Sequence, residues 1–157
     1  MKNLKYVGIS FYVLFVLIIT FCLFGKTPFS SSRFGDLSIV PLNADLGKFK
    51  KGSLLFGNSK LINKNDDIVY YNTINGKNVL SITKVNKIMN SSDVTYVIND
   101  GLFLSSEYAV GSVSKINSVF FLGYLYSFFT NSIVYFLTVI IPLLAYFIYL
   151  FRMRKYA

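Results

Sequence analysis

Residues 66–85 read DDIVYYNTINGKNVLSITKV, and this stretch decides the fold of the middle of the chain. Two runs rich in β-branched and aromatic residues, Asp67–Tyr71 and Val79–Val85, flank a turn signal at Asn75-Gly76. Asn-Gly strongly favours a two-residue hairpin turn, because both residues accept positive φ angles at low cost. The stretch therefore predicts an antiparallel β-hairpin.

Similar short runs recur on both sides of this hairpin. Lys26–Gly35 is a polar linker with helix breakers, and Asn99-Asp100-Gly101 is a second turn signal. Short runs at such spacing, without a helical period, predict an all-β unit. The remaining predicted strands are Leu37–Val40, Ser53–Phe56, Val94–Ile98 and Ala109–Val113.

A long uncharged, apolar run lies near each end of the chain. Tyr6–Phe24 has 19 residues and Asn131–Phe151 has 21, which is about the length that crosses a bilayer. A middle domain over 25–117 is too small to bury two such helices all round. A cleaved signal peptide is the alternative for the first run, but the run exceeds the roughly 7–15 residues of a signal core. The single cysteine, Cys22, is then a membrane-embedded thiol.

The charges predict an orientation. Lys2 and Lys5 precede the first span and three cations follow the second, whereas all seven acidic residues lie between the spans. By the positive-inside rule both termini are cytoplasmic. Much of the net charge of +9 then comes from the cations at the two ends, which set the membrane orientation, and we expect no nucleic-acid partner. A basic outer domain could contact anionic lipid headgroups, although a solvated face explains the same charge.

These features give the expected domain layout. The aromatic run Phe120–Phe129 suits an interfacial helix or turn, with a longer, tilted second span as the alternative. We expect cytoplasmic ends at 1–5 and 152–157, membrane helices at 6–24 and 131–151, an extracytoplasmic β domain at 25–117 and an interfacial segment at 118–130.

The residue types exclude several chemistries. Without histidine the chain has neither a Ser-His-Asp nor a Cys-His site, and its acidic residues are too scattered for a metal cage. We expect no metal and no cofactor. Adjacent Asp66 and Asp67 indicate a turn leading into a strand. Serine–lysine chemistry remains, and Lys84 is notable because it lies within an apolar strand, where an edge lysine that prevents aggregation is the alternative.

Several short segments occur in a fixed order between the spans. They are Leu42–Phe56, Asp66–Tyr70, Ile82–Val85, Asn99-Asp100, Val110–Val113 and Phe121–Tyr124. In order and spacing they resemble the type I signal peptidases, in particular the endoplasmic-reticulum and archaeal-like branch. The resemblance covers nearly the whole chain and implies a signal-peptidase-like β fold carried by two membrane helices.

The resemblance also implies site residues, and the departures fall among them. Ala44 occupies the nucleophile position, Lys84 the position of the base and Asp100 that of a supporting residue. Gly47 replaces a proline of the family pattern, and Val85 replaces an arginine. The implied substrate-binding residues are Leu42, Asn43, Asp45 and Ile82.

Because alanine has no nucleophilic oxygen, the sequence predicts a degenerate site that binds extended secretory signal peptides beside the membrane without cleaving them. An active serine endopeptidase is the first alternative, with Ser38 as nucleophile and Lys84 as base, because Ser38-Ile39-Val40-Pro41 is similar to the family's Ser-Met-x-Pro. Ser53 is a further candidate nucleophile. A non-catalytic membrane-anchored β scaffold is the second alternative. The expected partners are membrane lipid and signal peptides.

Overall fold

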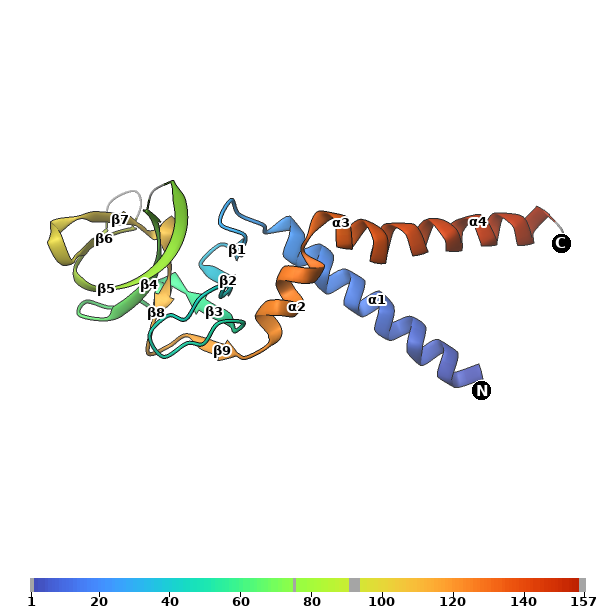
Figure 1. Cartoon of the computed structure of the whole chain (residues 1–157), viewed down its shortest axis with the longest axis horizontal. Helices are drawn as coiled ribbons and strands as arrows, with labels where there is room; N and C mark the ends of the chain where they lie inside the picture. Colours follow the sequence, from blue (N-terminus) through green and yellow to red (C-terminus); the bar gives the residue numbers. More distant parts are fainter. Residues whose placement is uncertain (1, 75, 91–93, 156–157) are drawn as a thin grey trace. The chain divides into compact units, whose positions relative to one another are not determined.

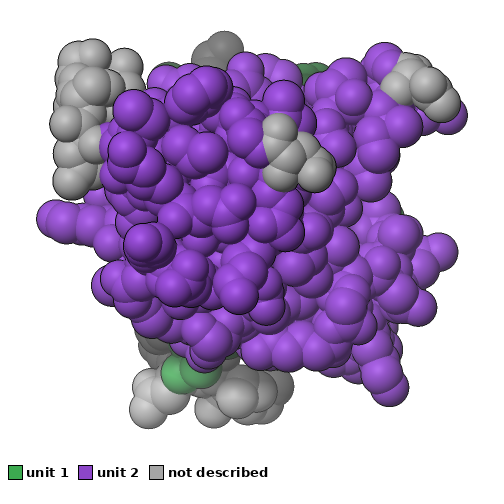
Figure 2. All heavy atoms as spheres, turned by 90° about the vertical axis from the view of Figure 1, so that its left-hand side faces the viewer, with its two compact units in different colours: residues 1–24, 127–157 green, residues 25–126 purple. Residues whose placement is uncertain are grey.

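The structure is a computed structural model that describes residues 2–74, 76–90 and 94–155. The chain forms two compact units. One contains residues 25–126 (purple in Figure 2), and the other combines residues 1–24 with residues 127–157.

Residues 25–126 form a β domain of two antiparallel sheets (Figure 1). The four-stranded sheet has the order β1 (Ser32–Phe34), β2 (Leu37–Pro41), β3 (Leu54–Asn58), β9 (Asn117–Val119). The five-stranded sheet has the order β7 (Phe103–Ser105), β6 (Val94–Ile98), β5 (Lys77–Asn90), β4 (Asp67–Ile74), β8 (Ala109–Ser112). All six predicted strands are confirmed. The three strands that the sequence missed have three residues each, too few to show an alternating pattern.

The hairpin of β4 and β5 has the predicted register. Ile74 pairs with Lys77, which leaves a two-residue turn, and Gly76 has a φ of +74°. Asn75 lies outside the described residues. The turn at residues 99–101 is a short 3₁₀ helix that joins β6 to β7.

The core consists of two apolar clusters on opposite faces of β4. Val69 packs in the cluster shared with the four-stranded sheet, while Ile68 packs in a second cluster with Val85 and Tyr96. Both β4 side chains are fully buried, and each such burial stabilises a fold by about 1.5–3 kcal/mol. The two sheets approach closely at Gly57, where a Cβ atom would lie 2.3 Å from the Val110 carbonyl oxygen.

Arg33 links the two sheets. From β1 its guanidinium donates hydrogen bonds to the carbonyl oxygens of Ser106 (2.9 Å) and Glu107, in the 3₁₀ turn Ser106–Tyr108 before β8. It also donates to the Ser59 hydroxyl at 3.3 Å. Strand β9 and the start of α2 (Leu122–Phe129) belong to this domain, which therefore extends past residue 117.

The other unit contains the two long apolar segments. Helix α1 spans Lys2–Phe24, and the second segment runs through α3 (Ser132–Tyr135), a π-helical stretch at Phe136–Ile140 and α4 (Ile141–Lys155). The windows Val7–Phe24 and Ser132–Tyr149 are long and apolar enough to cross a membrane, with mean hydropathies of 2.7 and 2.1. Only 11% and 6% of these windows are buried within the protein, so most of their apolar surface is exposed.

Polar contacts join these two segments. The Tyr12 hydroxyl donates to the Thr138 carbonyl oxygen at 2.9 Å. In a regular helix that carbonyl would accept the N–H of residue 142, but Pro142 has none. The hydroxyls of Thr20 and Tyr135 also lie 2.8 Å apart. Tyr12 thus donates to a carbonyl to which Pro142 cannot donate, as the apolar interior of a membrane would favour.

Candidate functional site

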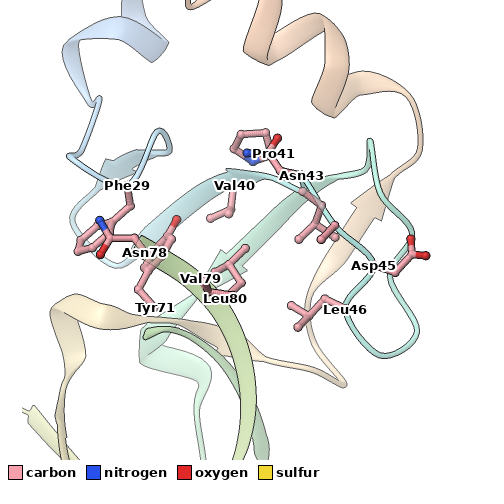
Figure 3. Close-up of a pocket in the computed structure, with 12 residues that line it drawn as sticks. Phe29, Val40, Pro41, Asn43, Asp45, Leu46, Tyr71, Asn78, Val79 and Leu80 are labelled. Atoms are coloured by element: carbon pink, nitrogen blue, oxygen red, sulfur yellow. The ribbon is translucent and has the colours of Figure 1, made fainter. Parts of the chain in front are cut away.

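A hollow of about 270 Å³ lies between the end of β2 with its following loop and the β4–β5 hairpin (Figure 3). Phe29, from the linker before β1, closes one side. Its lining is mostly apolar and comprises Phe29, Val40, Pro41, Leu42, Asn43, Ala44, Asp45, Leu46, Tyr71, Asn78, Val79 and Leu80.

Backbone hydrogen bonds shape the loop that carries Ala44. Leu42 donates to the Ser53 carbonyl at 2.9 Å and accepts from Gly52 at 2.8 Å. A carboxylate oxygen of Asp45 accepts the N–H of Lys51 at 2.7 Å, which fixes the turn between them. Ala44 itself is exposed at the rim of the hollow.

Gly47 explains one departure from the family pattern. Its φ is +54°, whereas proline is confined to a φ near −65°. A proline cannot occupy this backbone, so the proline that the resemblance would place here is incompatible with this loop.

Lys84 lies away from the hollow. It is exposed on β5, where Asp67 is its cross-strand neighbour. Leu80, four residues earlier on the same face, lines the hollow instead, and at about 3.3 Å per residue the two Cα atoms are roughly 13 Å apart along the strand. Ile82, between them, reaches the loop at Gly47. The described residues that line the hollow therefore include no lysine that could act as a base.

The alternative nucleophiles are buried elsewhere. Ser38, only 4% exposed, lines a second hollow of about 480 Å³ together with Arg33 and Glu107. Stacked Phe29 and Tyr71, with ring centroids 4.4 Å apart, contribute to both hollows and form their shared wall. Neither Ala44 nor Lys84 is among the described residues that line the second hollow.

Ser53 is also 4% exposed, and its backbone N–H and carbonyl both hold the loop. Asp100 lies in the 3₁₀ turn after β6, and its side chain is outside the described part of the structure. The described residues contain no cluster of three or more His, Cys, Asp or Glu side chains that could hold a metal.

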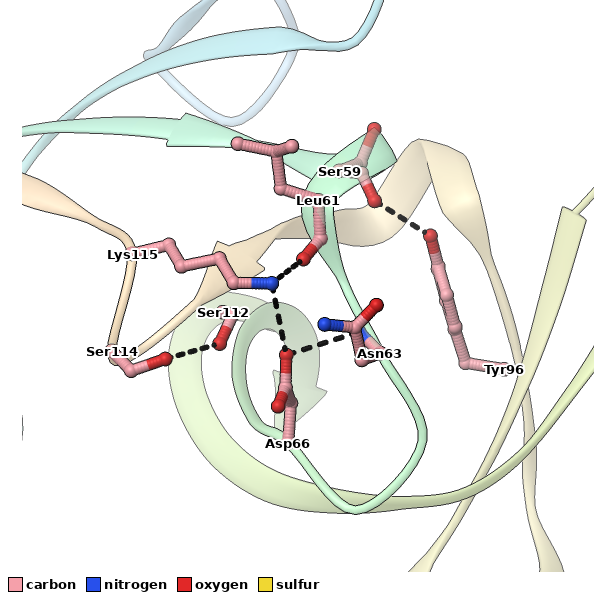
Figure 4. A network of polar contacts seen from close by, with 8 residues as sticks. All are labelled: Ser59, Leu61, Asn63, Asp66, Tyr96, Ser112, Ser114 and Lys115. Carbon is pink, nitrogen blue, oxygen red and sulfur yellow. Dashed lines mark hydrogen bonds and ion pairs between the residues drawn. The ribbon is translucent and has the colours of Figure 1, made fainter.

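A separate polar network around Lys115 has a structural role (Figure 4). The Lys115 ammonium donates to the Leu61 carbonyl oxygen at 2.6 Å and lies 3.8 Å from an Asp66 carboxylate oxygen. That carboxylate also accepts the Asn63 N–H, so Asp66 holds the turn before β4, as its position in the sequence indicates. Lys115 thus connects the loop after β8 to the segment between β3 and β4.

Tyr71 is the site residue that the sequence did not single out. Its hydroxyl is buried and has no hydrogen-bond partner among the described residues. Burial raises its pKa to about 12; the Ser31 hydroxyl beside it has a smaller, opposite effect, although its contact with Tyr71 lacks the geometry of a hydrogen bond. A buried hydroxyl without a partner costs about 1–3 kcal/mol, which a ligand carbonyl in the hollow could recover. Nothing in the sequence distinguishes Tyr71 from the neighbouring strand tyrosine, Tyr70.

Among the described strands, two edges beside the hollow have no partner. Strand β5 pairs with β4 over residues 77–84, but β6 joins its other edge only from Val85 onward. Strand β2 pairs with β1 only up to Ile39, which leaves Val40 and Pro41 without a neighbour on that side among the described strands. Such edges offer backbone donors and acceptors to an added strand.

Comparisons with protein-family models, curated proteins and solved structures find no match for this chain. The similarity to signal peptidases therefore stays a prediction, and the geometry above carries the functional argument.

Proposed function

We propose that this chain is a membrane-anchored β protein that binds an extended apolar peptide beside Ala44 without cleaving it. The supporting observation is the apolar hollow between two unpaired strand edges. An extended segment would add to these edges through its backbone and place alternate side chains in the hollow. The signal-peptidase resemblance identifies secretory signal peptides as the peptide class, presented outside the cytoplasm next to the bilayer.

The same geometry argues against catalysis. The nucleophile position is Ala44, and Lys84 is solvent-exposed, whereas a lysine used as a general base is activated by burial. Ser38 lines a different hollow. A pure scaffold would need no apolar hollow with open strand edges, so peptide binding accounts for more of the structure.

The test is binding of fluorescent signal-sequence peptides to the full-length chain in nanodiscs. Ala44→Trp adds a large ring at an exposed rim position, so we expect at least about tenfold weaker binding with little change in stability. Lys84→Ala is the matched control on β5 and should bind normally. A peptide N-methylated at alternate residues loses backbone donors and should bind weakly. Equal binding of the methylated peptide, or binding unaffected by Ala44→Trp, contradicts the proposed site.

A further inference from the structure

An exposed aromatic segment of the β domain lies beside an exposed group of lysines. Phe120 and Phe121 are 63% and 56% exposed, and Tyr124 and Leu125 on α2 are also exposed. Three cations, Lys48, Lys50 and Lys51, extend from the loop before β3. These seven residues are called the aromatic–lysine surface below.

Direct contacts join the two parts of this surface. The Gly123 N–H donates to the Gly52 carbonyl at 3.0 Å, and the Tyr124 ring lies so close to Gly52 that a Cβ there would be 2.0 Å from a ring carbon. Lys51 is covalently next to Gly52, and the Lys50 carbonyl accepts the Ser53 N–H at 3.1 Å. The lysine backbone is therefore fixed against the start of α2.

All three lysines of the loop are exposed. The Asp45 carboxylate is engaged with the Lys51 N–H, and the Lys48 ammonium lies 5.1 Å from the centroid of the Phe49 ring. Phe121 has a φ of +73°, an unusual conformation for a bulky residue, and its carbonyl accepts the Tyr124 N–H at 3.1 Å. This strained turn holds two phenylalanine side chains out of the domain.

Exposed aromatic residues next to lysines match the headgroup region of a bilayer. Aromatic rings settle at the boundary between acyl chains and headgroups, and lysines near an anionic surface each gain affinity. Residues 127–131 are all that separate Tyr126 from the second apolar segment at Ser132, so the chain keeps α2 within about 20 Å of that segment. A bilayer crossed by that segment would lie within reach of this surface.

We propose that the aromatic–lysine surface binds anionic phospholipid headgroups and inserts its aromatic side chains at the bilayer boundary. This inference rests on the membrane anchoring in the proposed function, but not on peptide binding. It assigns residues 48–51 a role that is separate from the hollow, which residues 42–46 of the same loop line.

The experiment uses single tryptophans, because the chain has none. Phe121→Trp is placed in full-length protein in nanodiscs whose lipids carry bromine near the headgroup end of the acyl chains. We expect bromine quenching in discs rich in phosphatidylglycerol and less quenching in phosphatidylcholine alone or at high salt. Phe103→Trp, 70% exposed on β7, is the control outside the surface and should stay unquenched. Phe11→Trp in α1 reports the span itself.

Lysine variants test the charge. Lys48→Gln, Lys50→Gln and Lys51→Gln together should lower the ratio of quenched to unquenched Phe121→Trp by about fivefold per lysine. Lys60→Gln, Lys77→Gln and Lys87→Gln, which remove the same charge elsewhere, should leave it unchanged.

Three results would overturn the proposal. The first is that lipid quenches Phe121→Trp no more than Phe103→Trp while Phe11→Trp is quenched. The second is that the two lysine triplets have the same effect. The third is that Phe121→Trp is shielded from aqueous iodide but not quenched by lipid, which identifies a protein partner. Absence of quenching at Phe11→Trp instead overturns the membrane anchoring itself, and peptide binding is measured independently.

Discussion

At the scale of single residues, Ala44 and Lys84 show that two residues assigned to one site from the sequence can lie apart in the structure. The resemblance places both in one site, but the structure puts Leu80 at the hollow and Lys84 farther along β5. Restoring one catalytic atom is therefore not enough.

Ala44→Ser should consequently show no peptide cleavage, because the described residues that line the hollow include no lysine to accept the serine proton, and the lysines of the same loop are exposed. Mass spectrometry of a signal peptide after prolonged incubation is the measurement. Peptide binding should remain, since serine and alanine are similar in size. Cleavage that disappears on adding Lys84→Ala would show instead that Lys84 reaches the hollow.

The buried hydroxyl of Tyr71 has no hydrogen-bond partner among the described residues, so it lowers the stability of the ligand-free protein. Tyr71→Phe removes a hydroxyl without a partner, so we expect the unfolding free energy at neutral pH to rise by about 1 kcal/mol. Peptide affinity should fall about fivefold, because the hydroxyl no longer donates to the ligand. Tyr70→Phe is the control. A variant that is less stable and binds normally would contradict a ligand role.

The raised pKa of Tyr71 predicts a pH dependence. A folded-state pKa of about 12, above the unfolded value near 10, means that the fold favours the neutral hydroxyl. The free energy of unfolding should then fall as the pH rises from about 10 to 12, by about 2–3 kcal/mol for this group. Denaturant titrations of wild type and Tyr71→Phe over this range should diverge, with the loss larger in wild type.

At the scale of elements, we expect the contact between α1 and the second apolar segment to depend on Pro142. Tyr12→Phe leaves the Thr138 carbonyl without its donor and should cost about 1 kcal/mol of stability in detergent or lipid. Pro142→Ala restores a backbone N–H that can reach this carbonyl, so Tyr12→Phe should cost less in that background.

The measurement is a double-mutant cycle by denaturant or thermal unfolding, in which the coupling between Tyr12 and Pro142 decides. Tyr135→Phe, which removes the partner of Thr20, is a control that should not depend on residue 142. Additive effects of Tyr12→Phe and Pro142→Ala would show that the proline does not create the role of Tyr12.

At the scale of the whole molecule, the charges at the two ends predict the orientation. In a Cys22→Ser background, Lys64→Cys on an exposed turn of the β domain should react with a membrane-impermeant maleimide on intact cells. Met153→Cys, which leaves the flanking cations in place, should react only after permeabilisation. The reverse pattern would invert the orientation, and labelling of both on intact cells would exclude two membrane crossings.

The sequence by itself determined the elements. Strand runs, turn signals and apolar length are local properties, so the six longer strands, the hairpin at Gly76 and the two long apolar helices follow from short windows. The three-residue strands β1, β7 and β9 escaped because each exists only through its neighbour in a sheet.

The site was decided only by the tertiary structure. Which side chain of β5 faces Ala44 depends on how the two sheets pack through the close approach at Gly57, and on the point where β5 changes partner from β4 to β6 near Val85. These features depend on distances of a few ångströms between residues that are far apart in the sequence, and no local pattern encodes them. They place Leu80 in the hollow, leave Lys84 in solvent and bury the hydroxyl of Tyr71.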